Sequence, residues 1–313
     1  MINDYWPHSC GVVHGYVMHN RFAGYVTALI TPFKNGKVDE AAFQRHIEWQ
    51  IEEGIHGIVP HGTTGESPTL QHGEVARLFN LAVEASAGRV PVIAGCGANS
   101  TAEAIALTKL AQEAGCDGNL QVSPYYNKPT QEGLYQHFKA VHDATGLPIV
   151  LYDVPGRTVV KIDVDTQARL AKLPRIVGVK DATGDLTRPI RTKLSCAEPF
   201  AQLTGEDALI VPFLAQGGDG CISVTSNIAP GLCVDLYHAW NRKDFATVQN
   251  INERLFPLHD ALFSETSPGP VKYAASQLGI CDYELRLPMV PIAAANERRV
   301  DAAMLALSLS GPK

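Results

Sequence analysis

The stretch IVGVKDA, residues 176–182, combines a strand-like pattern with a reactive side chain. Apolar and small residues lead directly into Lys180, and the turn-prone residues Thr183, Gly184 and Asp185 follow. A short apolar run bounded by turn residues is typical of a strand that is buried on both faces. Lysine is rarely buried without a role, and loss of water favours its neutral, nucleophilic form. A lysine that extends from the strand end into solvent is the competing interpretation.

The same strand-like pattern recurs along the chain, each time followed by a helical pattern. The predicted strands are Val26–Ile30, Gly57–Pro60, Val90–Gly95, Asn119–Val122, Pro148–Tyr152, Ile176–Lys180, Pro199–Leu203 and Gly220–Val224. The predicted helices that follow them are Asp39–Glu53, Gln71–Ser86, Thr101–Ala114, Gln131–Thr145, Asp163–Lys172, Leu186–Ser195, Glu206–Gln216 and Pro230–Arg242, with Asp39 and Ser100 as N-caps. Strands that alternate with helices pair in parallel, and eight such units in about this length predict an α/β fold, the (β/α)8 TIM barrel.

A doubly wound open sheet is the alternative fold. It would place a G-x-G-x-x-G motif after the first strand, whereas residues 31–34 read TPFK. After Arg242 the alternation stops, and Asp244–Ser264, Gly269–Leu278 and Glu297–Leu307 read as helices. We therefore expect a barrel over residues 22–242 and a helical region over 243–313 packed on it. Residues 1–21 are predicted to be a loosely ordered extension, or to follow a start codon placed too early.

Composition excludes several classes of protein. The 313 residues are 45% hydrophobic and 19% charged, with a net charge of −6. The sequence has no basic patch of the kind that would favour binding to nucleic acid. No apolar run approaches the ~20 residues of a membrane span. The seven cysteines form no C-x-x-C pair, which indicates a reducing compartment and predicts a cytoplasmic protein.

In a barrel of this type the active site lies at the C-terminal ends of the strands. The chemically capable residues predicted there are Thr63, Thr64, Tyr125, Tyr126, Tyr152, Asp153, Arg157, Lys180, Gly205, Glu206, Ser223, Thr225 and Asn227. Each alone has an ordinary structural explanation, such as a turn threonine or a packing tyrosine. Together they offer an amine, hydroxyls and a guanidinium, without metal-ligand spacing, a G-x-S-x-G motif or a phosphate loop. This set suits carbonyl chemistry through a Schiff base, with an arginine for a substrate carboxylate.

Five motifs then resemble one family. GTTGES (62–67), SPYYNKPTQEGLYQHF (123–138), LYDVPGRT (151–158), GVKDATGDL (178–186) and GCISVTSN (220–227) are similar to the dihydrodipicolinate synthase family, within the N-acetylneuraminate lyase-like class I aldolase superfamily. The resemblance runs from about Gly24 to near the C-terminus. It implies a lyase that condenses pyruvate with L-aspartate-4-semialdehyde to 4-hydroxy-tetrahydrodipicolinate, in lysine and diaminopimelate biosynthesis. It implies no cofactor beyond the covalent pyruvate imine, and no metal.

The resemblance also implies roles for individual residues. Lys180 resembles the Schiff-base lysine, Tyr152 the proton-relay tyrosine, and Thr64 the hydroxyl that links Tyr152 to Tyr126. In the family this last tyrosine reaches in from the neighbouring subunit, so a dimer is the minimal active unit and a homotetramer, a dimer of dimers, is expected. The substrate-binding positions are Thr63 for the pyruvate carboxylate, Arg157 for the semialdehyde carboxylate, and Gly205 and Ile222 for backbone carbonyls beside the lysine.

Feedback inhibition by L-lysine at the dimer interface is a further expectation from the family. The matching positions are Ser67, His72, Asn99, Glu103 and Tyr125, while Val75 stands where some lysine-sensitive members have a second histidine. Asn99 and Glu103 have a simpler explanation as the start of a helix, with Glu103 near its positive end. Asp153 stands where many relatives have asparagine, and the sequence does not tell which way it faces.

Two other functions remain open at this point. A sister aldolase on the same scaffold would act on N-acetylneuraminate, a 2-keto-3-deoxy sugar acid or 4-hydroxy-2-oxoglutarate. Arg157 and Tyr126 favour the synthase over these. A non-catalytic protein that binds pyruvate or an amino acid is the remote alternative, and the presence of both Lys180 and Tyr152 argues against it.

Overall fold

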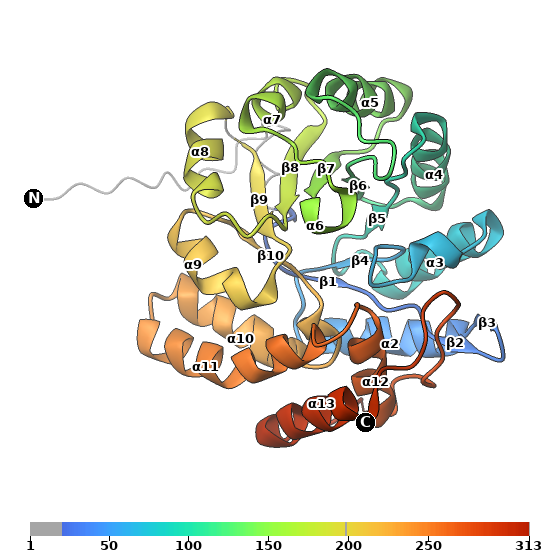
Figure 1. Ribbon diagram of the computed structural model, residues 1–313, viewed down its shortest axis with the longest axis vertical. Helices are drawn as coiled ribbons and strands as arrows, with labels where there is room; N and C mark the ends of the chain where they lie inside the picture. Colours follow the sequence, from blue (N-terminus) through green and yellow to red (C-terminus); the bar gives the residue numbers. More distant parts are fainter. Residues whose placement is uncertain (1–20, 198, 313) are drawn as a thin grey trace, which may run out of the picture.

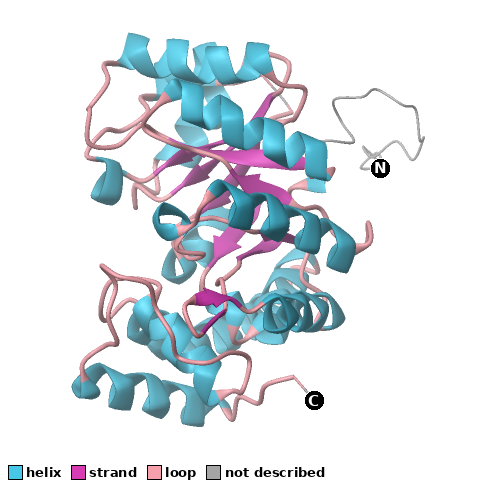
Figure 2. Cartoon of the chain, turned by 90° about the vertical axis from the view of Figure 1, so that its right-hand side faces the viewer, coloured by secondary structure: helices cyan, strands magenta, loops and turns pink. Residues whose placement is uncertain are grey.

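The computed structural model describes residues 21–197 and 199–312. The predicted N-terminal extension, apart from Arg21, lies outside the described residues. Figure 1 shows strands gathered at the centre of the molecule with helices around them, and the C-terminal helices lying against one side. Seen from the side in Figure 2, the strands are enclosed between helices. This arrangement confirms the predicted TIM barrel with C-terminal helices.

The barrel wall is one parallel sheet. Its strands are β1 (Gly24–Ala28), β4 (Gly57–Val59), β5 (Ile93–Gly95), β6 (Gly118–Val122), β7 (Ile149–Asp153), β8 (Ile176–Asp181), β9 (Ala201–Thr204) and β10 (Gly220–Ser223). They pair in the order β4-β1-β10-β9-β8-β7-β6-β5. A parallel bridge between Ile58 and Val92, with the Ile58 N–H donating to Pro91 O at 3.0 Å, joins the two end strands. The sheet therefore closes on itself, and all strand C-termini meet at one rim.

Helices surround this wall, with one short turn at its C-terminal rim and the last helices packed against one side (Figure 1). They are α2 (Glu40–Glu52), α3 (His72–Ser86), α4 (Thr101–Ala114), α5 (Gln131–Ala144), α6 (Pro155–Thr158), α7 (Val164–Leu170), α8 (Arg188–Ser195), α9 (Ile210–Ala215), α10 (Pro230–Asn241), α11 (Phe245–Leu262), α12 (Gly269–Gln277) and α13 (Ala294–Leu307). Both predicted N-caps are confirmed, because the Asp39 and Ser100 side chains accept hydrogen bonds from the N–H groups of Ala42 and Glu103. Most boundaries fall within two residues of the prediction.

Several local features differ from the prediction, including the start of β5 at Ile93, the start of α13 at Ala294 and the helical turn α6. The first strand is Gly24–Ala28, so it begins and ends two residues before the prediction, and the Ile30 N–H donates to the Asn227 side chain at 3.0 Å instead of to a neighbouring strand. The predicted helix Glu206–Gln216 divides into a 3₁₀ turn (Asp207–Leu209) and α9, which places Pro212 in the first turn of the α-helix. A short hairpin of β2 (Phe33–Lys34) and β3 (Lys37–Val38) was not predicted.

The core has two layers. Inside the barrel, a cluster that includes Val26, Ile93, Leu203 and Ile222 fills the interior below Tyr152. A larger apolar layer lies between the strands and the surrounding helices and extends into α11, α12 and α13. Because side chains alternate along each strand, one set fills the barrel and the other holds the helices. Among the described residues, no helix is long and apolar enough to cross a membrane.

Candidate active site

Lys180 and Tyr152 occupy the ends of two neighbouring strands. They are register partners in β8 and β7, and both line one cavity at the C-terminal rim of the barrel. Lys180 is only 6% exposed, and its Nζ atom lies 4.4 Å from the centre of the Tyr152 ring. The strand that the sequence predicted thus delivers a buried amine to the face of a phenol ring.

The space around the amine is kept open by a glycine. A Cβ atom on Gly205 would lie 2.9 Å from Lys180 Cε and 2.8 Å from the Ala182 Cβ. Ile222, from β10, is fully buried in the barrel interior. Gly205 therefore lies against the lysine side chain, whereas Ile222 belongs to the apolar cluster inside the barrel.

The two predicted threonines stand on the loop after β4. Thr63 and Thr64 line the same cavity as Lys180 and Tyr152. The loop is tightly folded, because the Gly65 and Ser67 N–H groups both donate to Gly62 O, at 3.1 and 3.3 Å. Thr64 is 4% exposed. The hydroxyls are thus carried by a fixed turn next to the amine.

The carboxylate of Glu66 anchors this loop to the C-terminal region. It accepts a 2.6 Å bond from Lys272 Nζ of α12 and a 3.0 Å bond from the Arg286 N–H. The side chains of Glu66 and Lys272 are 1% and 0% exposed. Sequence reasoning missed this pair, although a lysine within the apolar stretch PVKYAA, residues 270–275, was a usable signal.

Arg157 lies at the mouth of the site, on the single turn α6. It lines a second cavity of about 570 Å³ that shares Thr63, His61 and Ser67 with the first. Its Nη2 donates to Ser267 O at 3.4 Å. Glu206 is close by: burial raises its pKa, while the charges of Lys180 and Arg157 lower it. The guanidinium can therefore meet an anionic group entering along the larger cavity.

Four of the five positions expected for L-lysine line this larger cavity: Ser67, His72, Glu103 and Tyr125. His72 Nε2 lies 2.5 Å from Glu103 Oε1. Asn99 is not among the lining residues, and its backbone oxygen accepts a bond from Asn127 Nδ2. The cavity thus presents a carboxylate and an imidazole on adjacent helices.

Tyr126 is the one predicted catalytic residue that stays away from Lys180. It is 89% exposed, has a φ of 72°, and is absent from the described lining of both cavities. A non-glycine residue in this left-handed region indicates a backbone held in place for a reason. The side chain projects from the molecule instead of folding onto its own site.

His61 is a site residue that the sequence did not reveal. It lines both cavities, and its Nδ1 lies 2.6 Å from Gly95 O. Burial lowers its pKa, which favours the neutral ring. The only indication of this role in the sequence was the position of His61 between a predicted strand and the GTTGES motif. Within the described part of the chain, no group of three His, Cys, Asp or Glu side chains is placed to hold a metal ion.

Comparison with known proteins agrees with this geometry. The model of the "Dihydrodipicolinate synthetase family" matches residues 21–307. The 4-hydroxy-tetrahydrodipicolinate synthase of Rhodospirillum centenum is 62% identical over 288 residues, covering 92% of this chain and 99% of that protein.

Two solved structures are similar throughout. One is the chloride-inhibited dihydrodipicolinate synthase of Acinetobacter baumannii complexed with pyruvate, with a TM-score of 0.89, 42% identity, and coverage of 92% of this chain and 99% of that one. The other is the enzyme of Cyanidioschyzon merolae with lysine bound, with a TM-score of 0.89, 38% identity, and coverage of 92% and 98%. With the family model matching nearly the whole described chain, this protein belongs to the dihydrodipicolinate synthetase family.

Proposed function

We propose that the chain is a 4-hydroxy-tetrahydrodipicolinate synthase, a lyase of the class I aldolase type that condenses pyruvate with L-aspartate-4-semialdehyde. The observation that carries this is the buried Lys180 amine facing the Tyr152 ring at the barrel rim. The R. centenum relative is named for this activity, and the A. baumannii enzyme was solved with pyruvate. The reaction would serve lysine and diaminopimelate biosynthesis.

The first steps follow from the chemistry of a buried amine. Lys180 Nζ attacks the keto carbon of pyruvate, and the resulting carbinolamine loses water to form an imine. Removal of a proton from the pyruvate methyl group gives an enamine, whose carbon attacks the aldehyde of the second substrate. The amino group of that substrate then displaces Lys180 as the ring closes, so the lysine is regenerated and no cofactor is consumed.

Each of these steps moves a proton, and hydroxyl groups next to the imine carry it. Tyr152 would exchange protons with the imine nitrogen and carbon, and Thr64 would pass them on to the partner subunit's Tyr126. Thr63 would bind the pyruvate carboxylate, and Gly205 and Ile222 would offer their backbone carbonyls beside the lysine. Arg157 binds the semialdehyde carboxylate at the mouth.

The exposed Tyr126 supports a dimer as the minimal active unit and a dimer of dimers as the whole enzyme. The larger cavity supports inhibition by L-lysine, whose ammonium group would meet Glu103 and His72, as the lysine-bound C. merolae structure suggests. Residues 22–242 would form the barrel unit and 243–313 the helical region packed on it. Free thiols at the six described cysteines fit the cytoplasm.

Separating the two half-reactions tests this function. Arg157→Ala should lower the turnover of L-aspartate-4-semialdehyde by at least 100-fold, because a bidentate carboxylate contact is lost, while the pyruvate imine at Lys180 still forms. Arg169→Ala, an exposed arginine on α7 paired with Glu132, is the matched control. If Arg157→Ala left semialdehyde turnover unchanged, the second substrate would be a different aldehyde, as in a sister aldolase.

A further inference from the structure

The residues that follow the catalytic pair form a second pair on the outside of the barrel wall. Asp153 and Asp181 come directly after Tyr152 and Lys180 and are themselves register partners at the ends of β7 and β8. Side chains alternate between the two faces of a strand. Tyr152 and Lys180 therefore face the site, and the two carboxylates face outward. The structure thus answers the question of which way Asp153 points.

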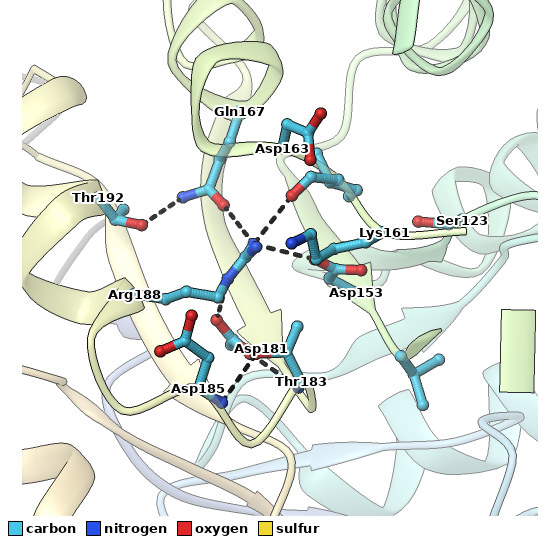
Figure 3. Close-up of polar contacts among 12 residues, drawn as sticks. Ser123, Asp153, Lys161, Asp163, Gln167, Asp181, Thr183, Asp185, Arg188 and Thr192 are labelled. Atoms are coloured by element: carbon cyan, nitrogen blue, oxygen red, sulfur yellow. Dashed lines mark hydrogen bonds and ion pairs between the residues drawn. The ribbon is translucent and has the colours of Figure 1, made fainter. Parts of the chain in front are cut away.

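One arginine joins these two carboxylates (Figure 3). Arg188 Nε donates to Asp181 Oδ2 at 2.8 Å, and its Nη2 donates to Asp153 Oδ2 at 2.9 Å. The Nη2 atom also donates to Ile162 O at 3.0 Å. The side chain of Arg188 is 3% exposed, and those of the two aspartates are 0% and 7% exposed. A single buried guanidinium therefore spans the ends of the two catalytic strands.

The chain between Lys180 and Arg188 is folded so that it returns this arginine to the strand end. Asp181 Oδ1 accepts bonds from the Thr183 N–H and hydroxyl, at 2.9 and 2.7 Å. The Asp185 N–H donates to Thr183 Oγ1, and Asp185 Oδ1 accepts from the Thr187 N–H and hydroxyl. These linked turns lead directly into α8, whose first residue is Arg188. The segment is thus a closed loop fixed at both ends on Asp181.

We call the cluster of Arg188, Asp153 and Asp181 the Arg188 bridge. Its balance of charge indicates that it fixes geometry more than it adds stability. Two buried carboxylates share one guanidinium, and Asp153 Oδ1 has no hydrogen-bond partner among the described residues. Burial raises the pKa of Asp153 to about 7 in spite of Arg188. Buried ion pairs often add little stability compared with apolar residues of the same volume. What a planar arginine fork does supply is a fixed direction for each bond.

We propose that Arg188 is a positioning residue for the catalytic pair: by holding Asp153 and Asp181 it keeps the ends of β7 and β8 in register, so that the Lys180 amine stays over the Tyr152 ring. This inference rests on the proposed function. The geometry of the site then depends on a side chain on the outer face of the barrel wall, away from the substrates and from the side chains of Lys180 and Tyr152.

The test compares variants by the rate at which pyruvate forms a borohydride-trappable adduct on Lys180. Arg188→Lys keeps the charge but cannot bond in two fixed directions, so we expect this rate and kcat to fall 10- to 100-fold with a small change in KM for pyruvate. Arg191→Lys on the same helix, exposed and 4.0 Å from Asp185, is the matched control and should match the wild type. Equal rates in Arg188→Lys and Arg191→Lys would overturn the proposal and leave Arg188 a stability residue.

A second pair of variants covers the case in which Arg188→Lys does not fold. Asp153→Asn keeps an oxygen to accept from Arg188 Nη2, whereas Asp153→Ala does not. We expect imine formation at least five-fold faster in Asp153→Asn than in Asp153→Ala, and equal rates would refute the bridge. Failure of the proposed function itself has a different result, because the wild-type chain would then form no adduct on Lys180 at all.

Discussion

The ion pair of Lys272 and Glu66 should be one of the costliest single contacts to break. Its atoms lie 2.6 Å apart with both side chains at most 1% exposed, and Lys272 Nζ also lies 4.1 Å from the centre of the Phe33 ring. Lys272→Met keeps the length of the side chain but leaves a buried carboxylate without its cation. Removing one partner of a buried pair costs about 3–5 kcal/mol. For a chain of this size that corresponds to a fall of about 5–8 °C in melting temperature.

Scanning calorimetry with two further variants tests the reasoning. In Glu66→Gln/Lys272→Met the unpaired charge is gone, so at least half of the lost stability should return. Lys34→Met removes an exposed partner of Asp282, 3.8 Å away, and should shift the melting temperature by less than about 2 °C. Because Glu66 anchors the turn with Thr63 and Thr64, Lys272→Met should also lower kcat in the molecules that remain folded. A melting temperature for Lys272→Met within about 2 °C of the wild type would refute the estimate.

Three shorter predictions concern pH, packing and assembly. Asp153 has a folded-state pKa of about 7 against 3.8 for the free group, so between these values the folded chain holds a proton that the unfolded chain has lost, and stability falls as pH rises toward 7. The loss of folding free energy across this pH range is about 4 kcal/mol at most. The melting temperature of Asp153→Asn should therefore rise relative to that of the wild type between pH 5 and pH 8. A difference in melting temperature that does not vary with pH would contradict this. Gly205→Ala should lower pyruvate imine formation at least 10-fold, because its Cβ would displace Lys180 Cε, 2.9 Å away; unchanged trapping in a stopped-flow assay would show that the lysine can move aside. Tyr126→Ala should lower kcat at least 10-fold. If Tyr126 acts across subunits, mixing this variant with the inactive Lys180→Ala variant should give hybrid dimers that regain activity. Hybrid dimers without activity would show that Tyr126 acts within its own chain.

Periodicity was enough to predict the barrel. Each of the eight strand-and-helix units has its own apolar pattern and turn residues, so local sequence carries the information that parallel pairing then assembles. Lys180 was recognisable for the same reason, because a lysine at the end of a doubly buried strand breaks the local pattern. The hairpin of β2 and β3 was missed because two-residue strands are too short to show a period.

The contacts that fix the site depend on pairings that periodicity does not encode. Glu66 and Lys272 are 206 residues apart, and Asp153 lies 35 residues from Arg188. Alternation along β7 and β8 was a usable clue for the second pair, because it places Asp153 and Asp181 behind Tyr152 and Lys180 once the strands are known to be neighbours. Nothing comparable in the sequence identifies which helix supplies the arginine.

If the buried Lys180 amine captures a keto acid, covalent trapping measures that step directly. The chain is incubated with pyruvate, reduced with borohydride, digested, and its peptides are mapped by mass. We expect the adduct on the peptide that holds Lys180, in an amount that rises in proportion to the activity lost. The Lys180→Arg variant should form no adduct. A reduced adduct on another lysine, or full activity after reduction in the presence of pyruvate, would contradict the account.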